Sequence, residues 1–231
     1  MWLNPSVSEK TWQTGSGVLR DLLGMTNSPV AVSVRPARGE PPEKKTRICR
    51  AILDAAAGES VVVRRENNAC FGGAWHLGFR RIDDPEVLGM VKKFVVEGEK
   101  LFSSYGALDN LIGQMGGVPD NARSAFLLSP LEKAEERPEL IVFVCDPEQA
   151  CRLLTLLTFG DGKMPGIKIG GPTCRLALIY PLVSGEANVS FYDYTARKTC
   201  RVERDKLLVS LPIDRLDEIV AGTVAQLDAH T

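Results

Sequence analysis

Three cysteines stand out as the residues best placed to do chemistry: Cys49, Cys70 and Cys174. Each is expected at the start of a helix, where free backbone N–H groups favour a negative charge. Two of the three lie next to pairs of glycines, which are Gly72, Gly73, Gly170 and Gly171. A cysteine in such a place is a better nucleophile or soft metal ligand than an ordinary thiol.

Two kinds of site could use these cysteines. If the three sulfurs converge, they could hold an iron–sulfur cluster of the [4Fe–4S] type with one iron open to a ligand, or zinc with an outside fourth ligand. Without a metal, Cys70 or Cys174 could act as a nucleophile. A third interpretation has no chemistry at all, because free cysteines are among the most buried residue types and pack as small hydrophobes.

A histidine and three arginines near the cysteines could also take part in such a site. His76, six residues after Cys70, could be a fourth ligand, a general base or a hydrogen-bonded core residue. Arg47, Arg50 and Arg64 bracket the cysteines and could hold a carboxylate or phosphate of a small anionic ligand, or lie in solvent. Phosphate-loop, dinucleotide-binding, nucleophile-elbow and zincin motifs are absent from the sequence.

Composition limits the class of protein. The chain has 231 residues, of which 44% are hydrophobic and 25% charged, as in ordinary globular proteins. Its 28 basic and 29 acidic residues give a net charge of -1, so we expect no binding to nucleic acid through bulk charge. There is no apolar run of roughly 20 residues and no signal-like N-terminus, so we expect no membrane span and a cytoplasmic location. The six cysteines should then be thiols or ligands rather than disulfides.

Helices and strands are expected to alternate along the chain. Helices are predicted at 18–23, 47–57, 84–105, 146–159 and 214–227, and strands at 30–34, 60–63, 125–128, 140–144, 167–169, 189–194 and 207–211. Asp146, Pro147 and Gln149 form a strong helix start. We predict an α/β fold, a mixed β-sheet with flanking helices, in a single domain spanning 1–231.

The spacing of the cysteines indicates a weak internal repeat. Cys70 follows Cys49 by 21 residues, and Cys174 follows Cys151 by 23 residues. The half-repeats would cover about 28–80 and 138–182, each a strand, a helix, a strand and a cysteine turn, and could give a pseudo-two-fold core. Chance similarity is the equal alternative.

Several strings together resemble a known family. They are RICRA at 47–51, NACFGGAWHLGF at 68–79, DPEQA at 146–150, TCRLA at 173–177, SGEANV at 184–189 and LPIDRLDEIV at 211–220. The chain is similar, over about residues 14 to 223, to domain-of-unknown-function family 169, the ArCR family of bacteria and archaea. The resemblance implies that Cys49, Cys70 and Cys174 are the motif cysteines, whereas Cys145, Cys151 and Cys200 are not.

One departure from the family pattern lies after Val189. The family usually has a glycine-containing turn of Gly-Asp-Arg character there, whereas this chain has FYDYTAR at 191–197, in which Arg197 keeps the basic position.

The leading hypothesis is therefore a cytoplasmic, prokaryotic protein that binds an iron–sulfur cluster through three cysteines. It would act in redox or cofactor-linked metabolism on a small anionic ligand, and it could form a homo-oligomer. The alternatives are a non-catalytic small-molecule-binding or accessory module and a metal-free cysteine-nucleophile enzyme.

Overall fold

The computed structural model describes residues 11–81, 84–115 and 117–230. The chain divides into two compact units. The first unit comprises the chain up to Ser33, Cys49–Val61 and everything from Leu127 onward. The second comprises Val34–Ile48 and Val62–Phe126. Each unit is described by itself.

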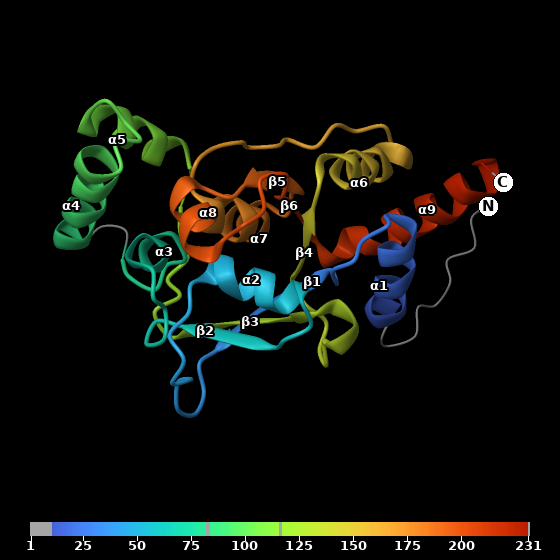
Figure 1. Ribbon diagram of the computed structural model, residues 1–231, viewed down its shortest axis with the longest axis horizontal. Coiled ribbons are helices and arrows are strands. Elements are labelled where there is room, and N and C mark those ends of the chain that lie inside the picture. Colours follow the sequence, from blue (N-terminus) through green and yellow to red (C-terminus); the bar gives the residue numbers. More distant parts are fainter. Residues whose placement is uncertain (1–10, 82–83, 116, 231) are drawn as a thin grey trace. The chain divides into compact units, whose positions relative to one another are not determined.

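Six strands form one sheet in the order β2-β3-β1-β4-β6-β5 (Figure 1). They are β1 (Val30–Pro36), β2 (Val61–Arg64), β3 (Ser124–Pro130), β4 (Leu140–Cys145), β5 (Asn188–Phe191) and β6 (Leu207–Pro212). The pairings β1–β4, β4–β6 and β5–β6 are antiparallel. Helices and a sheet built from distant segments confirm the α/β class.

The first unit carries the larger core. Its helices are α1 (Thr11–Leu22), α2 (Ile48–Ala56, all but its first residue), α6 (Pro147–Phe159), α7 (Tyr180–Ser184), α8 (Tyr194–Cys200) and α9 (Leu216–His230). Every residue of β4 is buried, so both faces of the sheet are covered there. On one face, Phe143 and Val209 pack with Leu153 of α6 and Ile219 of α9 in a single cluster.

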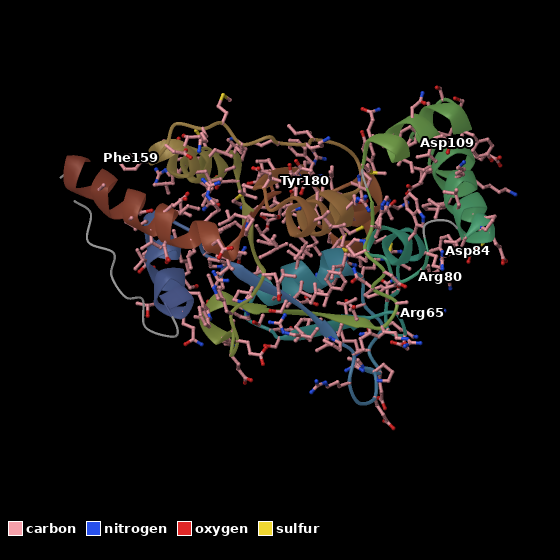
Figure 2. The ribbon with its side chains drawn as sticks, turned by 180° about the vertical axis from the view of Figure 1, so that it is seen from behind. Arg65, Arg80, Asp84, Asp109, Phe159 and Tyr180 are labelled. Atoms are coloured by element: carbon pink, nitrogen blue, oxygen red, sulfur yellow. The ribbon has the colours of Figure 1, made fainter. Side chains whose placement is uncertain are left out.

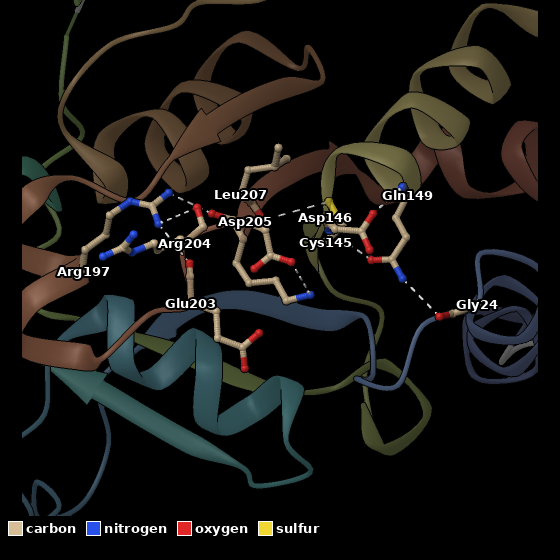
Figure 3. Close-up of polar contacts among 10 residues, drawn as sticks. Gly24, Cys145, Asp146, Gln149, Arg197, Glu203, Arg204, Asp205 and Leu207 are labelled. Carbon is tan, nitrogen blue, oxygen red and sulfur yellow. Dashed lines mark hydrogen bonds and ion pairs between the residues drawn. The ribbon is translucent and has the colours of Figure 1, made fainter.

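The start of α6 shows how local sequence fixes an element. The Asp146 side chain accepts a hydrogen bond from the backbone N–H of Gln149 at 2.9 Å, and the Asp146 N–H donates to the Gln149 side chain at 3.1 Å (Figure 3). This capping box is the one predicted from the sequence. Gln149 also donates to the Gly24 carbonyl at 3.1 Å, which links α6 to the turn after α1.

The second unit is smaller. Its helices are α3 (Phe71–His76), α4 (Pro85–Lys93), a wide π-turn η1 (Phe94–Gly98) and α5 (Tyr105–Gln114). Trp75 of α3 packs with Val87 and Val91 of α4. Gly78 ends α3 with a φ of +77°, and a Cβ there would lie 2.0 Å from the Pro119 carbonyl oxygen, so only glycine fits.

Three sequence predictions were wrong. Residues 167–169 form no strand, because the Lys168 backbone N–H and carbonyl bond to the Asn188 side chain instead of a neighbouring strand. The strand predicted at 189–194 ends at Phe191, because Asp193 caps a new helix, α8, by accepting from the Ala196 N–H at 2.7 Å.

The helix predicted at 84–105 is interrupted. It ends in the π-turn, Lys100 takes a φ of +53°, and Ser104 caps the separate helix α5. A positive φ is a conformation that a helix cannot continue through. The two predicted half-repeats also differ, because 28–80 contains its second strand, β2, and 138–182 lacks one.

Candidate functional site

Cys70 is the sulfur with the best-defined surroundings. It is half-buried and is the N-cap residue of α3. Its Sγ accepts a hydrogen bond from the Gly73 backbone N–H at 3.2 Å and another from Nη1 of Arg47 at 3.4 Å. A guanidinium and a helix-start N–H both stabilise a negative charge, so both donors are suited to charge that develops on this sulfur during a reaction.

A short pairing of two segments brings Arg47 to Cys70. Thr46 and Asn68 form an isolated parallel bridge. The Thr46 N–H donates to the Asn67 carbonyl at 2.9 Å, and the Ala69 N–H donates to the Thr46 carbonyl at 2.7 Å. Residue 47 therefore lies alongside residues 69–70, although 23 positions separate Arg47 from Cys70 in the chain.

A buried asparagine holds this pairing together. Asn67 is 1% exposed. Its amide donates to the Val62 carbonyl at 2.9 Å and the Lys44 carbonyl at 3.4 Å, and its oxygen accepts from the Arg64 N–H at 2.6 Å. One side chain thus ties the end of β2 to the segment that carries Arg47.

Of the four predicted glycines, Gly73 is the one tied to a cysteine. A Cβ at Gly73 would lie 3.0 Å from Cβ and 3.2 Å from Sγ of Cys70. At Gly72 and Gly171 a Cβ would meet no atom within 4 Å, and at Gly170 it would meet a methyl group of Leu176 at 3.3 Å. A side chain at Gly73 would press on Cys70, so glycine eases the approach of the sulfur to the Gly73 N–H.

The surface next to Cys70 is aromatic and basic. The Phe71 ring is 37% exposed, and the guanidinium of Arg80 lies over it, 5.5 Å from the ring centroid. Figure 2 labels Arg80 beside α3. This cation would attract an anionic ligand toward the sulfur.

His76 lies at the other end of α3 from Cys70. Six residues of helix correspond to a rise of about 9 Å, so its imidazole is not placed to take a proton from Cys70. The Cys70 sulfur has Arg47 and Gly73 as its hydrogen-bond partners in the described chain, and the His76 ring packs edge-on against Trp75 with centroids 4.5 Å apart.

The other two motif cysteines also lie at helix starts, but they are enclosed. Cys49 is 8% exposed in the first turn of α2, and Cys174 is 6% exposed in the first turn of a helix that continues through the π-turn η3 (Arg175–Ile179) into α7. The neighbouring Arg175 is also buried. Burial lowers the pKa of its guanidinium, and the charge of Cys174 opposes that shift.

The remaining cysteines lie in ordinary environments. Cys145, at the end of β4, has its pKa raised to about 12 by burial. Cys151 is exposed in the middle of α6, and Cys200, the last residue of α8, is buried. None of the six cysteines forms a disulfide with another cysteine of the described chain.

The other predicted arginines bond to the protein itself. Arg50 forms an ion pair with Asp54 at 2.6 Å, and this partner raises its pKa. Arg64 donates to the carbonyls of Arg38 and Gly39. Arg197 donates to the carbonyls of Glu203 and Arg204 (Figure 3) and to those of Tyr192 and Lys206, so here the family's basic position holds a loop in place.

Within the described chain, no three His, Cys, Asp or Glu side chains are grouped to hold a metal ion, and the three-cysteine site stays a prediction. Sequence reasoning named Arg47 but assigned it to a substrate, and it missed Asn67. The Asn67-Asn68 pair ahead of the cysteine was the available signal, since asparagines often bond to the backbone in turns.

The fold and site define a mixed α/β protein with a half-buried cysteine held by an arginine and a helix start. The chain belongs to the family described as uncharacterised ArCR, domain-of-unknown-function family 169, whose model matches residues 18–222. It is 24% identical over 211 residues to "Uncharacterized protein MJ0308" of Methanocaldococcus jannaschii, covering 87% of this chain and 89% of that protein. No solved structure shows significant similarity. Within 11–81, 84–115 and 117–230, no helix is both long and apolar enough to span a membrane.

Proposed function

We propose that the protein acts through Cys70, as a metal-free thiolate nucleophile toward a small anionic substrate. The observation that carries this proposal is the contact of the Cys70 Sγ with the Arg47 guanidinium at 3.4 Å and the Gly73 N–H at 3.2 Å. A thiolate is the reactive form of cysteine, and a partly exposed, positively charged setting is typical of reactive cysteines.

The reaction step follows from the sulfur. An electron pair of the thiolate forms a bond to an electrophilic carbon or sulfur atom of the substrate, and the leaving group departs with the pair of the bond that breaks. Before this step the thiol proton of Cys70 passes to water, because His76 is not placed to take it. Arg47 holds the sulfur, while Arg80 supplies positive charge for an anionic substrate.

Alkylation by iodoacetamide, mapped by mass spectrometry of the folded protein, tests this proposal. Cys151 is the internal reference, because it is exposed in the middle of α6. Although Cys70 is less exposed, it should react at pH 7 about tenfold faster or more. Arg47→Gln should slow Cys70 several-fold and leave Cys151 unchanged.

Arg65→Gln is the matched control. It removes the same charge from the exposed surface of the same unit, and it should leave the Cys70 rate within about twofold because interactions between exposed charges are largely screened. If Cys70 reacts no faster than Cys151, or if both arginine variants have the same effect, the nucleophile proposal fails and the accessory-module interpretation is favoured.

The second candidate is an iron–sulfur protein that uses Cys49, Cys70 and Cys174 in the cytoplasm. It is favoured by one observation: all three cysteines lie at helix starts, whereas Cys145, Cys151 and Cys200 do not. Soft thiolate ligands of this kind bind iron–sulfur clusters, and three of them would leave one iron for a ligand.

Purification without oxygen distinguishes the candidates. A [4Fe–4S] protein should contain about four iron atoms per chain, with matching sulfide and a visible absorption band. Replacing Cys49, Cys70 and Cys174 by serine should remove both, while Cys151→Ser should not. Protein without iron, or iron that survives the triple replacement, would exclude the cluster.

A further inference from the structure

Three hydroxyl groups of the first unit are buried and make no hydrogen bond to any described residue. They belong to Ser190, Tyr192 and Ser210, which are 1%, 2% and 0% exposed. Nearly all buried polar groups in native proteins have a partner, so three unpartnered hydroxyls in neighbouring strands need an explanation. A bound ligand with hydrogen-bonding atoms would provide it.

Two of these hydroxyls lie on the same face of the sheet. Val189 and Val209 pair in register and both pack in the main core. Since side chains alternate along a strand, Ser190 and Ser210 point to the opposite face. Ser210 pairs with Asn188, so it is diagonal to Ser190, at a separation of about 7–8 Å. A compact ion between them is within hydrogen-bonding reach of both hydroxyls.

Tyr192 extends this row. It follows Ser190 by two residues, just beyond the end of β5, and its neighbour Phe191 is exposed while Tyr192 itself is buried. Burial is the main cause that raises the pKa of the Tyr192 hydroxyl, the charges of Cys49, Cys200 and Cys145 raise it further, and Arg197 lowers it.

The helical segment that covers this face brings a positive charge. The π-turn η3 packs on β5 and β6, and the Asn188 amide fixes it by donating to the Leu176 carbonyl at 2.9 Å. Arg175, the first residue of η3, is 2% exposed. A guanidinium keeps its charge in proteins, so Arg175 gives the segment that packs on β5 and β6 a buried positive charge.

We propose that the Ser190, Tyr192 and Ser210 hydroxyls form an internal site for a small anion, with Arg175 supplying the favourable potential. Each hydroxyl can rotate to donate to the ion, and a compact anion such as chloride or formate suits the spacing of the serines. The site lies in the first unit and does not depend on the chemistry of Cys70.

Thermal unfolding in a series of sodium salts at constant ionic strength tests this proposal. Gluconate, which is too bulky for a buried site, is replaced stepwise by chloride or by formate. A ligand that binds only the folded state raises the melting temperature with concentration, so the melting temperature should rise by a few degrees in one or both salts. Equal melting temperatures in gluconate, chloride and formate would overturn the site and indicate buried water alone.

Variants make the test specific. Tyr192→Phe and the double variant Ser190→Ala, Ser210→Ala remove unpartnered hydroxyls with little loss of packing. They should be at least as stable as the wild type in gluconate, and they should lose the gain from chloride or formate. Ser129→Ala, on β3, should keep the full gain. An anion effect that persists in Tyr192→Phe and in the double variant would contradict the proposal.

Discussion

The two cysteines that lie beside glycine pairs have opposite environments in the structure. The Cys70 sulfur in the second unit is half-buried and has two donors from the protein, Arg47 and Gly73. Cys174 in the first unit is 6% exposed and lies between the buried Thr173 and Arg175. The same local pattern therefore produces one accessible sulfur and one enclosed sulfur.

The difference comes from what packs on each turn. The α3 turn faces a loop that supplies a charged side chain, whereas the Cys174 turn is covered by its own unit: Thr173 donates to Asp193 at 2.7 Å, and η3 packs on β5 and β6. A helix start offers backbone N–H groups to the sulfur in both places, but only a sulfur that a substrate can reach can act as a nucleophile. Function thus depends on the surroundings that distant segments provide.

The largest expected difference is between the alkylation rates of Cys70 and Cys174. Under native conditions, Cys174 should react with iodoacetamide at least about a hundred times more slowly than Cys70, because it must wait for local opening of the fold. Cys145 should be slower still, since burial raises its pKa to about 12. Mass spectrometry after timed labelling measures all three rates, and equal rates in urea provide the control for intrinsic reactivity. A Cys174 rate close to that of Cys70 would remove the distinction between the two turns.

Two buried asparagines, one beside each cysteine, should contribute similarly to the free energy of unfolding. Asn67 bonds to three backbone groups beside Cys70, and Asn188 bonds to the Lys168 N–H, the Lys168 carbonyl and the Leu176 carbonyl beside Cys174. Either change to alanine should lower the free energy of unfolding by about 2–3 kcal/mol, because buried backbone groups lose their partners. Urea unfolding measures this loss.

Reactivity separates the two asparagine variants. Asn67→Ala should slow Cys70 alkylation because it loosens the segment that holds Arg47, and Asn188→Ala should leave the Cys70 rate unchanged. If both variants changed the Cys70 rate equally, Asn67 would have no specific role in positioning Arg47.

Short-range features of the sequence predicted much of the fold. The capping box of α6, the all-apolar β4 and the helix start at Cys70 all follow from neighbouring residues, and the structure contains each of them. Such elements are predictable because their local hydrogen bonds and their burial in the fold favour the same structure. The match to the family model over residues 18–222 confirms the resemblance.

Long-range side-chain bonds were not predictable. The contact between Arg47 and Cys70 requires the bridge between Thr46 and Asn68, which no local pattern encodes. Residues 167–169 have strand-forming side chains, but the Asn188 side chain takes the backbone groups of Lys168. The sequence thus identified the cysteine but not the partner that sets its chemistry.

A smaller effect on the Cys70 alkylation rate is expected from alanine at Gly73, and Gly72→Ala is its matched control. Gly73→Ala would place a methyl group 3.2 Å from the Cys70 Sγ, which should displace the sulfur from the Gly73 N–H and lower the alkylation rate several-fold. Gly72→Ala adds the same methyl group where nothing lies within 4 Å, so the rate should change by less than about twofold. Timed labelling of both variants checks this, and a Gly72→Ala rate as low as that of Gly73→Ala would show that α3 as a whole, rather than the sulfur contact, was disturbed.

Because Tyr192 is enclosed in the first unit, the free energy of unfolding should fall at alkaline pH. Burial, with a further contribution from Cys49, raises the pKa of Tyr192 well above its ordinary value. The folded protein therefore keeps the phenol proton where the unfolded chain, with a pKa of about 10, loses it. The resulting stability is fully present below pH ~10 and falls above it by at most about 1.4 kcal/mol per pH unit. Urea midpoints between pH 8 and 11 measure this slope, which should be shallower in Tyr192→Phe than in the wild type. Identical slopes would mean that the Tyr192 hydroxyl is open to solvent, and the contrast between an enclosed first-unit site and an accessible Cys70 would then fail.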